Sequence, residues 1–141
     1  MKVLIVLLLL VVYTNAFGII GRTQSAAVKG ILMCNNKPAS NVKVKLYDDD
    51  RVGMDELLAQ GKTDSQGFFQ LQGSTKEITT IDPKVNVYHD CEDEFKPCQR
   101  KITIYIPDAY ISSGKNPKRI YDAGTIQLAG KFKGETRDCI N

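Results

Sequence analysis

Residues that could carry catalysis are few in this chain, which contains one histidine and four cysteines. His89 could act as general base for a serine or cysteine nucleophile, the usual pairing in covalent catalysis. It precedes Asp90 at the end of a segment with strand-like alternation. A histidine in that place is more simply a hydrogen-bonded strand residue, because each ring nitrogen can donate or accept. We therefore predict a structural His89, no catalytic residues and no enzymatic activity.

The cysteines are Cys34, Cys91, Cys98 and Cys139. An even number is typical of a disulfide framework in an exported chain, and the N-terminus described below predicts export. Zinc sites usually contain closely spaced cysteine or histidine pairs, and the chain has no CxxC and a single histidine, so we predict no zinc site. Sequence alone permits three pairings. Because Cys91 and Cys98 flank a short charged loop between predicted neighbouring strands, the favoured pairing is Cys91–Cys98 with Cys34–Cys139.

An acidic cluster is formed by Asp48, Asp49 and Asp50, with Asp55 and Glu56 shortly after. Several carboxylates close together are the ligands that calcium prefers. The cluster lacks the fixed spacing and the glycine of an EF-hand loop. The alternative is a solvated loop whose charges prevent strand pairing at a sheet edge. We favour this alternative and assign neither a metal nor another cofactor.

Two basic groups lie near the C-terminus. If they shared a face they could attract an anionic membrane surface, at about 1 kcal/mol for each charge. An ordinary solvated surface is the alternative. Basic and acidic residues are interleaved and the net charge is only +3, so we expect no nucleic-acid partner. The basic turn contains Lys115, Lys118 and Arg119, and the basic tail contains Lys131, Lys133 and Arg137.

The elements that position these residues are predicted to be strands, because hydrophobic residues alternate with polar ones. Val42–Leu46 and Lys101–Ile106 both show this period of two, which is typical of strands with one buried face. Turn signals separate such segments, and in Asp64–Gly67 we expect a positive φ at Gly67 and a side-chain bond from Asp64 to the backbone. The predicted strands are 26–34, 42–48, 57–63, 67–72, 79–90, 98–106 and 119–129.

Seven or eight short strands with intervening turns predict an all-β fold, an antiparallel sandwich. Two short segments could form helical turns instead, namely Asp55–Leu58 and Pro107–Tyr110.

The N-terminus has the three regions of a secretory signal peptide. Lys2 supplies the positive charge, Val3–Val12 is uninterrupted apolar sequence, and Thr14 and Ala16 are the small residues before cleavage. A membrane anchor needs about 20 apolar residues, so this run is too short. We therefore expect residues 1–16 to be removed and residues 17–141 to form one secreted, extracellular domain.

Successive motifs of the mature chain resemble the nematode transthyretin-like family. The resemblance implies a secreted, prealbumin-like β-sandwich, extracellular or at a cell surface, in a family whose molecular activities are mostly unassigned. The motifs are Val28–Cys34, Lys37–Ala39, Val42–Asp48, Gly61–Phe69, Asp82–Lys84, Tyr88–Cys91, Lys96–Arg100, Tyr121–Thr125 and Gly134–Cys139.

Two activities of the wider prealbumin-like group do not carry over. Its 5-hydroxyisourate hydrolases use several histidines, an arginine and a C-terminal Tyr-Arg-Gly-Ser, whereas this chain has one histidine and ends Cys139-Ile140-Asn141. Transthyretin binds hormones in a channel between subunits, and we find no counterparts of the channel residues. The oligomeric state stays open.

We therefore predict a non-enzymatic extracellular binding or signalling module. Its partner would be an extracellular protein or cell-surface ligand, with an anionic membrane as a further candidate. The alternatives are a carrier of small apolar ligands and, third, a hydrolase. Because binding residues concentrate on loops held by a rigid frame, loops 48–56, 92–97 and 112–119 are the candidate contact surfaces. Their candidate residues are Asp48, Asp49, Asp50, Glu92, Asp93, Glu94, Lys115, Lys118 and Arg119.

Overall fold

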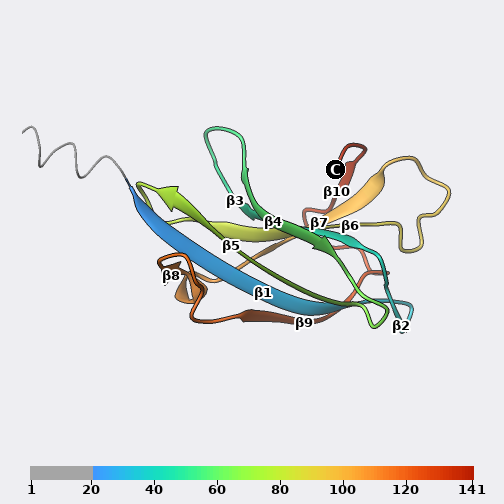
Figure 1. The fold of residues 1–141 in the computed structure, drawn as a ribbon. Helices are drawn as coiled ribbons and strands as arrows, with labels where there is room; N and C mark the ends of the chain where they lie inside the picture. Colours follow the sequence, from blue (N-terminus) through green and yellow to red (C-terminus); the bar gives the residue numbers. More distant parts are fainter. Residues whose placement is uncertain (1–20) are drawn as a thin grey trace, which may run out of the picture.

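Residues 21–141 are described by a computed structural model, and nearly all of their regular structure is β-strand (Figure 1). The predicted signal peptide lies outside the described residues. Within residues 21–141, no helix has the length and apolar character needed to cross a bilayer. The elements are β1 (Arg22–Cys34), β2 (Lys37–Pro38), β3 (Lys43–Asp48), β4 (Glu56–Lys62), β5 (Phe68–Glu77), β6 (Pro83–His89), β7 (Gln99–Tyr105), the 3₁₀ turn η1 (Asp108–Tyr110), β8 (Ser112–Ser113), β9 (Tyr121–Gln127) and β10 (Thr136–Asp138).

The strands form two five-stranded sheets that pack as a sandwich, which confirms the predicted fold class. In the first sheet, the long β1 pairs with β2, β5, β8 and β9. The second sheet has the order β10-β7-β6-β3-β4. All pairs are antiparallel except β1 with β9, which run parallel.

The core lies between the sheets and follows the period of two. On β3, Val44 and Leu46 are fully buried while Lys43 and Lys45 are partly exposed on the other face. Ile102 and Ile106 point to the same core from β7 and the residue after it, as predicted. Burying such aliphatic side chains contributes about 1.5–3 kcal/mol each, so the alternation is the main source of the fold's stability.

The turn at Asp64–Gly67 joins β4 to β5 and has the predicted geometry. Gly67 has a φ of +78°, and the Asp64 carboxylate accepts hydrogen bonds from the backbone N–H groups of Gln66 (2.9 Å) and Phe68 (3.0 Å). A Cβ on Gly67 would collide with the carbonyl oxygen of Leu32. Glycine is therefore required here both by φ and by the close approach of β1.

Each of the seven predicted strands has a counterpart, with altered bounds. Residues 79–82, predicted as the start of a strand, instead form a loop held by Gln24, whose side chain donates to the Thr79 carbonyl (2.8 Å) and accepts from the Ile81 N–H (3.0 Å). Pro107–Tyr110 contains the 3₁₀ turn, whereas Glu56–Leu58 is strand. The short strands β2, β8 and β10 were not predicted.

The outer face of β6 is buried too, although Asn86 and Tyr88 lie on the face of the strand opposite the core residues Val85 and Val87. Asn86 and Tyr88 are both 4% exposed. Thr103 donates to the Asn86 side-chain oxygen (2.7 Å), and the Lys45 ammonium lies 5.6 Å from the centre of the Tyr88 ring. Because β6 is a central strand, side chains from β3 and β7 cover it from both sides.

Candidate functional site

Two of the three predicted contact loops, 48–56 and 112–119, lie at one end of the sandwich, and loop 92–97 lies at the other. Loop 48–56 follows the end of β3 where Asp48 pairs with Pro83, the first residue of β6. Loop 92–97 follows the other end of β6, near the start of β3. Loop 112–119 begins with β8, which pairs with Gln24 and Ser25 near the start of β1. The Gln24 side chain also binds the Thr79 carbonyl, so this loop lies at the same end of the sandwich as residues 79–82 (Figure 1). The loops cannot form one contact surface.

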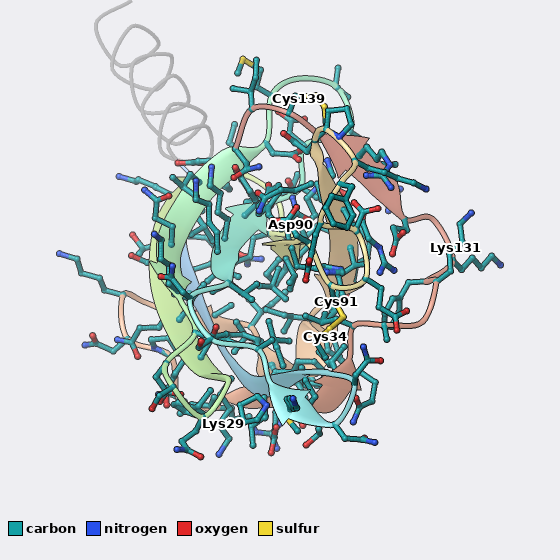
Figure 2. All side chains as sticks on the ribbon, turned by 90° about the vertical axis from the view of Figure 1, so that its right-hand side faces the viewer. Lys29, Cys34, Asp90, Cys91, Lys131 and Cys139 are labelled. Atoms are coloured by element: carbon teal, nitrogen blue, oxygen red, sulfur yellow. A yellow bond between two sulfur atoms is a disulfide. The ribbon has the colours of Figure 1, made fainter. Side chains whose placement is uncertain are left out.

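The favoured disulfide pairing is wrong: the bonds are Cys34–Cys91 and Cys98–Cys139. Cys91 lies two residues beyond His89, on the core side, where it meets the end of β1 and links the two sheets (Figure 2). Cys98 precedes Gln99, which pairs with Asp138 of the unpredicted strand β10. That register places Cys139 beside Cys98. The prediction of a Cys91–Cys98 bond failed because the two cysteines lie beside different strands: Cys91 is beside the end of β1, and Cys98 is beside the end of β10.

Two arginine–carboxylate pairs attach the C-terminal segment to this same region, which we call the disulfide end (residues 89–100 and 130–141 with Cys34). Arg100 binds both carboxylate oxygens of Glu135 (2.7 and 3.0 Å) and donates to the carbonyls of Cys91 (2.9 Å) and Gly130 (2.7 Å). Arg137 binds both oxygens of Asp93 at 2.6 Å. Hydrogen bonds from Arg100 and Arg137 lower the pKa values of Glu135 and Asp93, respectively.

These pairs change the assignment of two predicted surface residues. Asp93 is buried and fully engaged by Arg137, so it holds loop 92–97 in place instead of contacting a ligand. Arg137, predicted as part of a basic tail, is neutralised by the same contact. Glu92 and Glu94 are exposed, as expected of contact residues. Sequence reasoning missed Arg100 and Glu135. Arg100 had a signal in the sequence, because it lies in phase with Ile102 and alternation therefore places it on the core face, whereas Glu135 lies outside any alternating segment.

His89 lies between the sheets at the disulfide end and is 2% exposed. Its Nδ1 accepts a hydrogen bond from the Cys91 N–H (3.0 Å), so the neutral ring carries its proton on Nε2, which is buried without a partner among the described residues. Burial and the charge of Arg100, which pairs with His89 in the β6–β7 register, lower its pKa to about 4. His89 is therefore a buried, hydrogen-bonded residue of β6, the environment that the sequence analysis expected.

The opposite end is acidic. Asp48, Glu56 and Glu77 bring carboxylate oxygens within 4.8 Å of one another. Burial raises the pKa of Asp48 although the Asp82 N–H opposes it, and a hydrogen bond with Glu56 raises that of Glu77. Glu77 was not predicted as a member, because its place beside Glu56 depends on the contact between β4 and β5. These carboxylates repel one another, and a proton or a cation would relieve the repulsion.

The remaining acids of loop 48–56 are mostly engaged. Asp49 and Asp55 both bind the Lys84 ammonium, at 3.2 and 2.6 Å, and Asp49 also accepts from the Tyr105 hydroxyl (2.9 Å). Burial opposes the charge on Lys84, but these hydrogen bonds raise its pKa. Asp50 accepts from the Val52 N–H and caps the loop. The three consecutive aspartates thus have different contacts. Asp48 joins Glu56 and Glu77, Asp49 pairs with Lys84, and Asp50 accepts a hydrogen bond within the loop.

The two basic groups do not share a face. Lys115 and Lys118 are exposed near the acidic end, and Arg119 lies over the Tyr110 ring (5.7 Å) and donates to the Ala109 carbonyl. Lys131 projects into solvent at the disulfide end (Figure 2). The two groups therefore cannot act together on one membrane surface.

Two of the hollows on this surface are open and mostly polar, whereas a third, of about 290 Å³ at loop 92–97, has a mainly apolar lining. One of about 400 Å³ lies between loop 48–56 and residues 79–82 and is lined largely by charged and hydroxyl side chains. Another of about 220 Å³ lies beside the arginine pairs of the disulfide end. Sites for small apolar ligands are mainly lined by hydrophobic side chains, and these two hollows are not.

Comparison with known proteins agrees with this architecture. A sequence profile described as the transthyretin-like family matches residues 29–107. This chain belongs to the transthyretin-like family. It is similar to three Caenorhabditis elegans proteins: transthyretin-like protein 5 (58% identical over 139 residues, 98% of this chain and 99% of that protein), protein 33 (57% over 120 residues, 84% of each) and protein 2 (51% over 140 residues, 95% of each). The recognition made from the sequence motifs is confirmed.

The family profile spans three of the four cysteines together with His89 and Arg100, and ends before β9 and β10. The transthyretin-like proteins named above extend over nearly the whole chain or most of it, so the similarity includes the C-terminal segment that completes the disulfide end.

Proposed function

We propose that this transthyretin-like protein is a secreted, non-enzymatic binding module that recognises an extracellular or cell-surface protein through loop 92–97. The observation that carries the proposal is Phe95, whose side chain is 97% exposed at the tip of a loop fixed on both sides. Transfer of an aromatic ring from water into a partner's apolar pocket is favourable, and aromatic residues are enriched among those that dominate binding energy at interfaces.

The loop is held by several independent constraints. Its flanking residues Cys91 and Cys98 bond to different parts of the chain, and Arg137 clamps Asp93 from β10. Within the loop, the Lys96 N–H donates to the Asp93 carbonyl (3.2 Å). A loop already ordered before binding loses little conformational entropy on association, which favours recognition.

Export is supported by the predicted signal peptide and by the disulfides, which persist in oxidising compartments. Expression of the full chain in eukaryotic cells tests this point. We expect the protein in the medium with its N-terminus at Phe17. Retention of an intact, cell-associated chain would contradict the proposal.

Binding is tested with fluorescently labelled protein on intact nematode cells. Phe95→Ser should remove most saturable binding, because truncating a central aromatic anchor costs 2 kcal/mol or more, roughly 30-fold in affinity. Val52→Ser is the matched control, since Val52 is equally exposed (98%) at the opposite end. Equal loss in both variants, or none in Phe95→Ser, would show that loop 92–97 is not the contact surface.

A further inference from the structure

The outer face of the second sheet carries a row of lysines that the proposed function does not use. Strand register places Lys62 opposite Lys43, Lys43 opposite Tyr88, and Tyr88 opposite Lys101. Residues directly opposite in an antiparallel sheet share a face. Lys45 lies on that face too, one pleat along β3. At about 4.8 Å between strands, the row from Lys62 to Lys101 is about 14 Å long.

These lysines have few charge partners. Lys43 donates to the main-chain oxygen of Asn141 (2.8 Å), and the Asn141 side chain donates to Gln99 of β7 (3.0 Å), so this residue crosses β6 between Lys43 and β7. Lys45, Lys62 and Lys101 form no ion pair within residues 21–141. Asp138 pairs with Gln99 beside this row, and its carboxylate accepts from the Ile140 N–H (2.8 Å). Lys84, on the same sheet face but toward the acidic end, is neutralised by Asp49 and Asp55.

Two lysines of the row face each other directly across neighbouring strands. Like charges directly opposite each other across two strands are destabilising, and Lys43 and Lys62 are such a pair. An anionic ligand that bridged them would remove the repulsion. The charges therefore complement a ligand with repeated anionic groups, and not an isolated ion.

The rest of this surface indicates a hydrophilic ligand. The neighbouring cross-strand row consists of Gln60, Lys45, Asn86 and Thr103. Of these, Gln60 and Thr103 are exposed and offer an amide and a hydroxyl group, whereas Asn86 is buried beneath them. The hollows described above lie at the two ends of the sandwich and not over this row. A flat array of cations and hydrogen-bonding groups suits a polymer whose backbone is itself hydroxylated and whose charges repeat.

We propose that the outer face of the second sheet, centred on Lys43, Lys45, Lys62 and Lys101, binds a sulfated polysaccharide. This surface is separate from Phe95, and the inference goes beyond recognition of a protein partner. It does not depend on loop 92–97 being a contact surface.

The test is a calorimetric titration of the oxidised protein with a heparin oligosaccharide of defined length, at physiological ionic strength. The double variant Lys62→Gln with Lys101→Gln should bind about 30-fold more weakly, since each of the two cations removed contributes roughly 1 kcal/mol near an anionic surface. The control is Lys115→Gln with Lys118→Gln, which removes the same charge from an exposed turn elsewhere and should bind as the unchanged protein does.

Higher salt should weaken binding of the unchanged protein, because screening shortens the range of the attraction. Equal weakening in both double variants would overturn the assignment to this face, and so would an absence of heparin binding. Binding to vesicles containing anionic phospholipid without binding to heparin would overturn it in favour of a membrane. The Phe95→Ser variant should bind heparin as the unchanged protein does. A failure of the proposal for loop 92–97 can therefore be told apart from a failure of the polysaccharide proposal.

Discussion

Protonation of His89 should control how strongly this protein is destabilised by acid. The imidazole is buried and its pKa is lowered from 6.5 to about 4. The unfolded chain therefore binds a proton between pH 6.5 and 4 that the native protein does not. Stability is highest above the unfolded pKa and falls as the pH decreases through this interval. At 1.36 kcal/mol per pH unit, His89 alone should remove about 3 kcal/mol between pH 7 and pH 4.

The change that isolates this contribution is His89→Asn. The asparagine carbonyl can accept from the Cys91 N–H in place of Nδ1, and it does not titrate in this range. The groups that act electrostatically on His89 are Arg100, Glu135, Asp90 and Asp93, and all remain in the variant. Their own contribution to the pH dependence therefore largely cancels when the two proteins are compared.

Urea unfolding followed by circular dichroism, without reducing agent, measures the effect. We expect His89→Asn to be less stable at pH 7 because packing is lost, and to lose about 3 kcal/mol less than the unchanged protein on going to pH 4. Val87→Ala serves as a control, since it weakens the core beside His89 without removing a titrating group. It should retain the full pH dependence.

The reasoning is refuted if the unchanged protein and His89→Asn lose the same stability between pH 7 and pH 4. A direct check is available because the chain has a single histidine, whose imidazole protons can be followed by NMR without ambiguity. A midpoint near 6.5 in the folded protein would equally refute the argument.

Three further outcomes are expected from the structure. Replacing Cys98 and Cys139 together by alanine should lower the free energy of unfolding by up to about 4 kcal/mol, from the 41-residue separation of the pair, and peptide mapping without reduction should recover these two joined. Glu77→Gln should stabilise the protein by a few tenths of a kcal/mol at pH 7 in urea unfolding, because a hydrogen bond with Glu56 and the charges of Asp48 and Glu56 raise the pKa of Glu77 and so disfavour its ionised form, and the gain should vanish at low pH where these carboxylates are protonated. Gly67→Ala should cost at least about 2 kcal/mol by the same measurement, since φ is +78° and the added methyl meets the Leu32 carbonyl; an unchanged midpoint would contradict this.

Features that depend on local chemistry were predictable from the sequence. Alternation along β3 and β7 revealed which side chains face the core, because side chains on a strand point alternately to its two faces. The turn at Asp64–Gly67 followed from the conformational freedom of glycine and the short reach of aspartate. The family was recognisable for the same reason, since its motifs are mostly strands and turns of this kind.

The partners of the cysteines and charged residues were decided only by the tertiary structure. The pairing of β10 with β7 brings Cys139 to Cys98 and Arg137 to Asp93, and neither contact has a local signal in the chain. Likewise, Glu77 joins Asp48 only because β5 continues past its predicted end. Sequence patterns report what a residue prefers as its immediate surroundings. Which distant residue supplies those surroundings depends on how the strands are ordered and aligned in the two sheets.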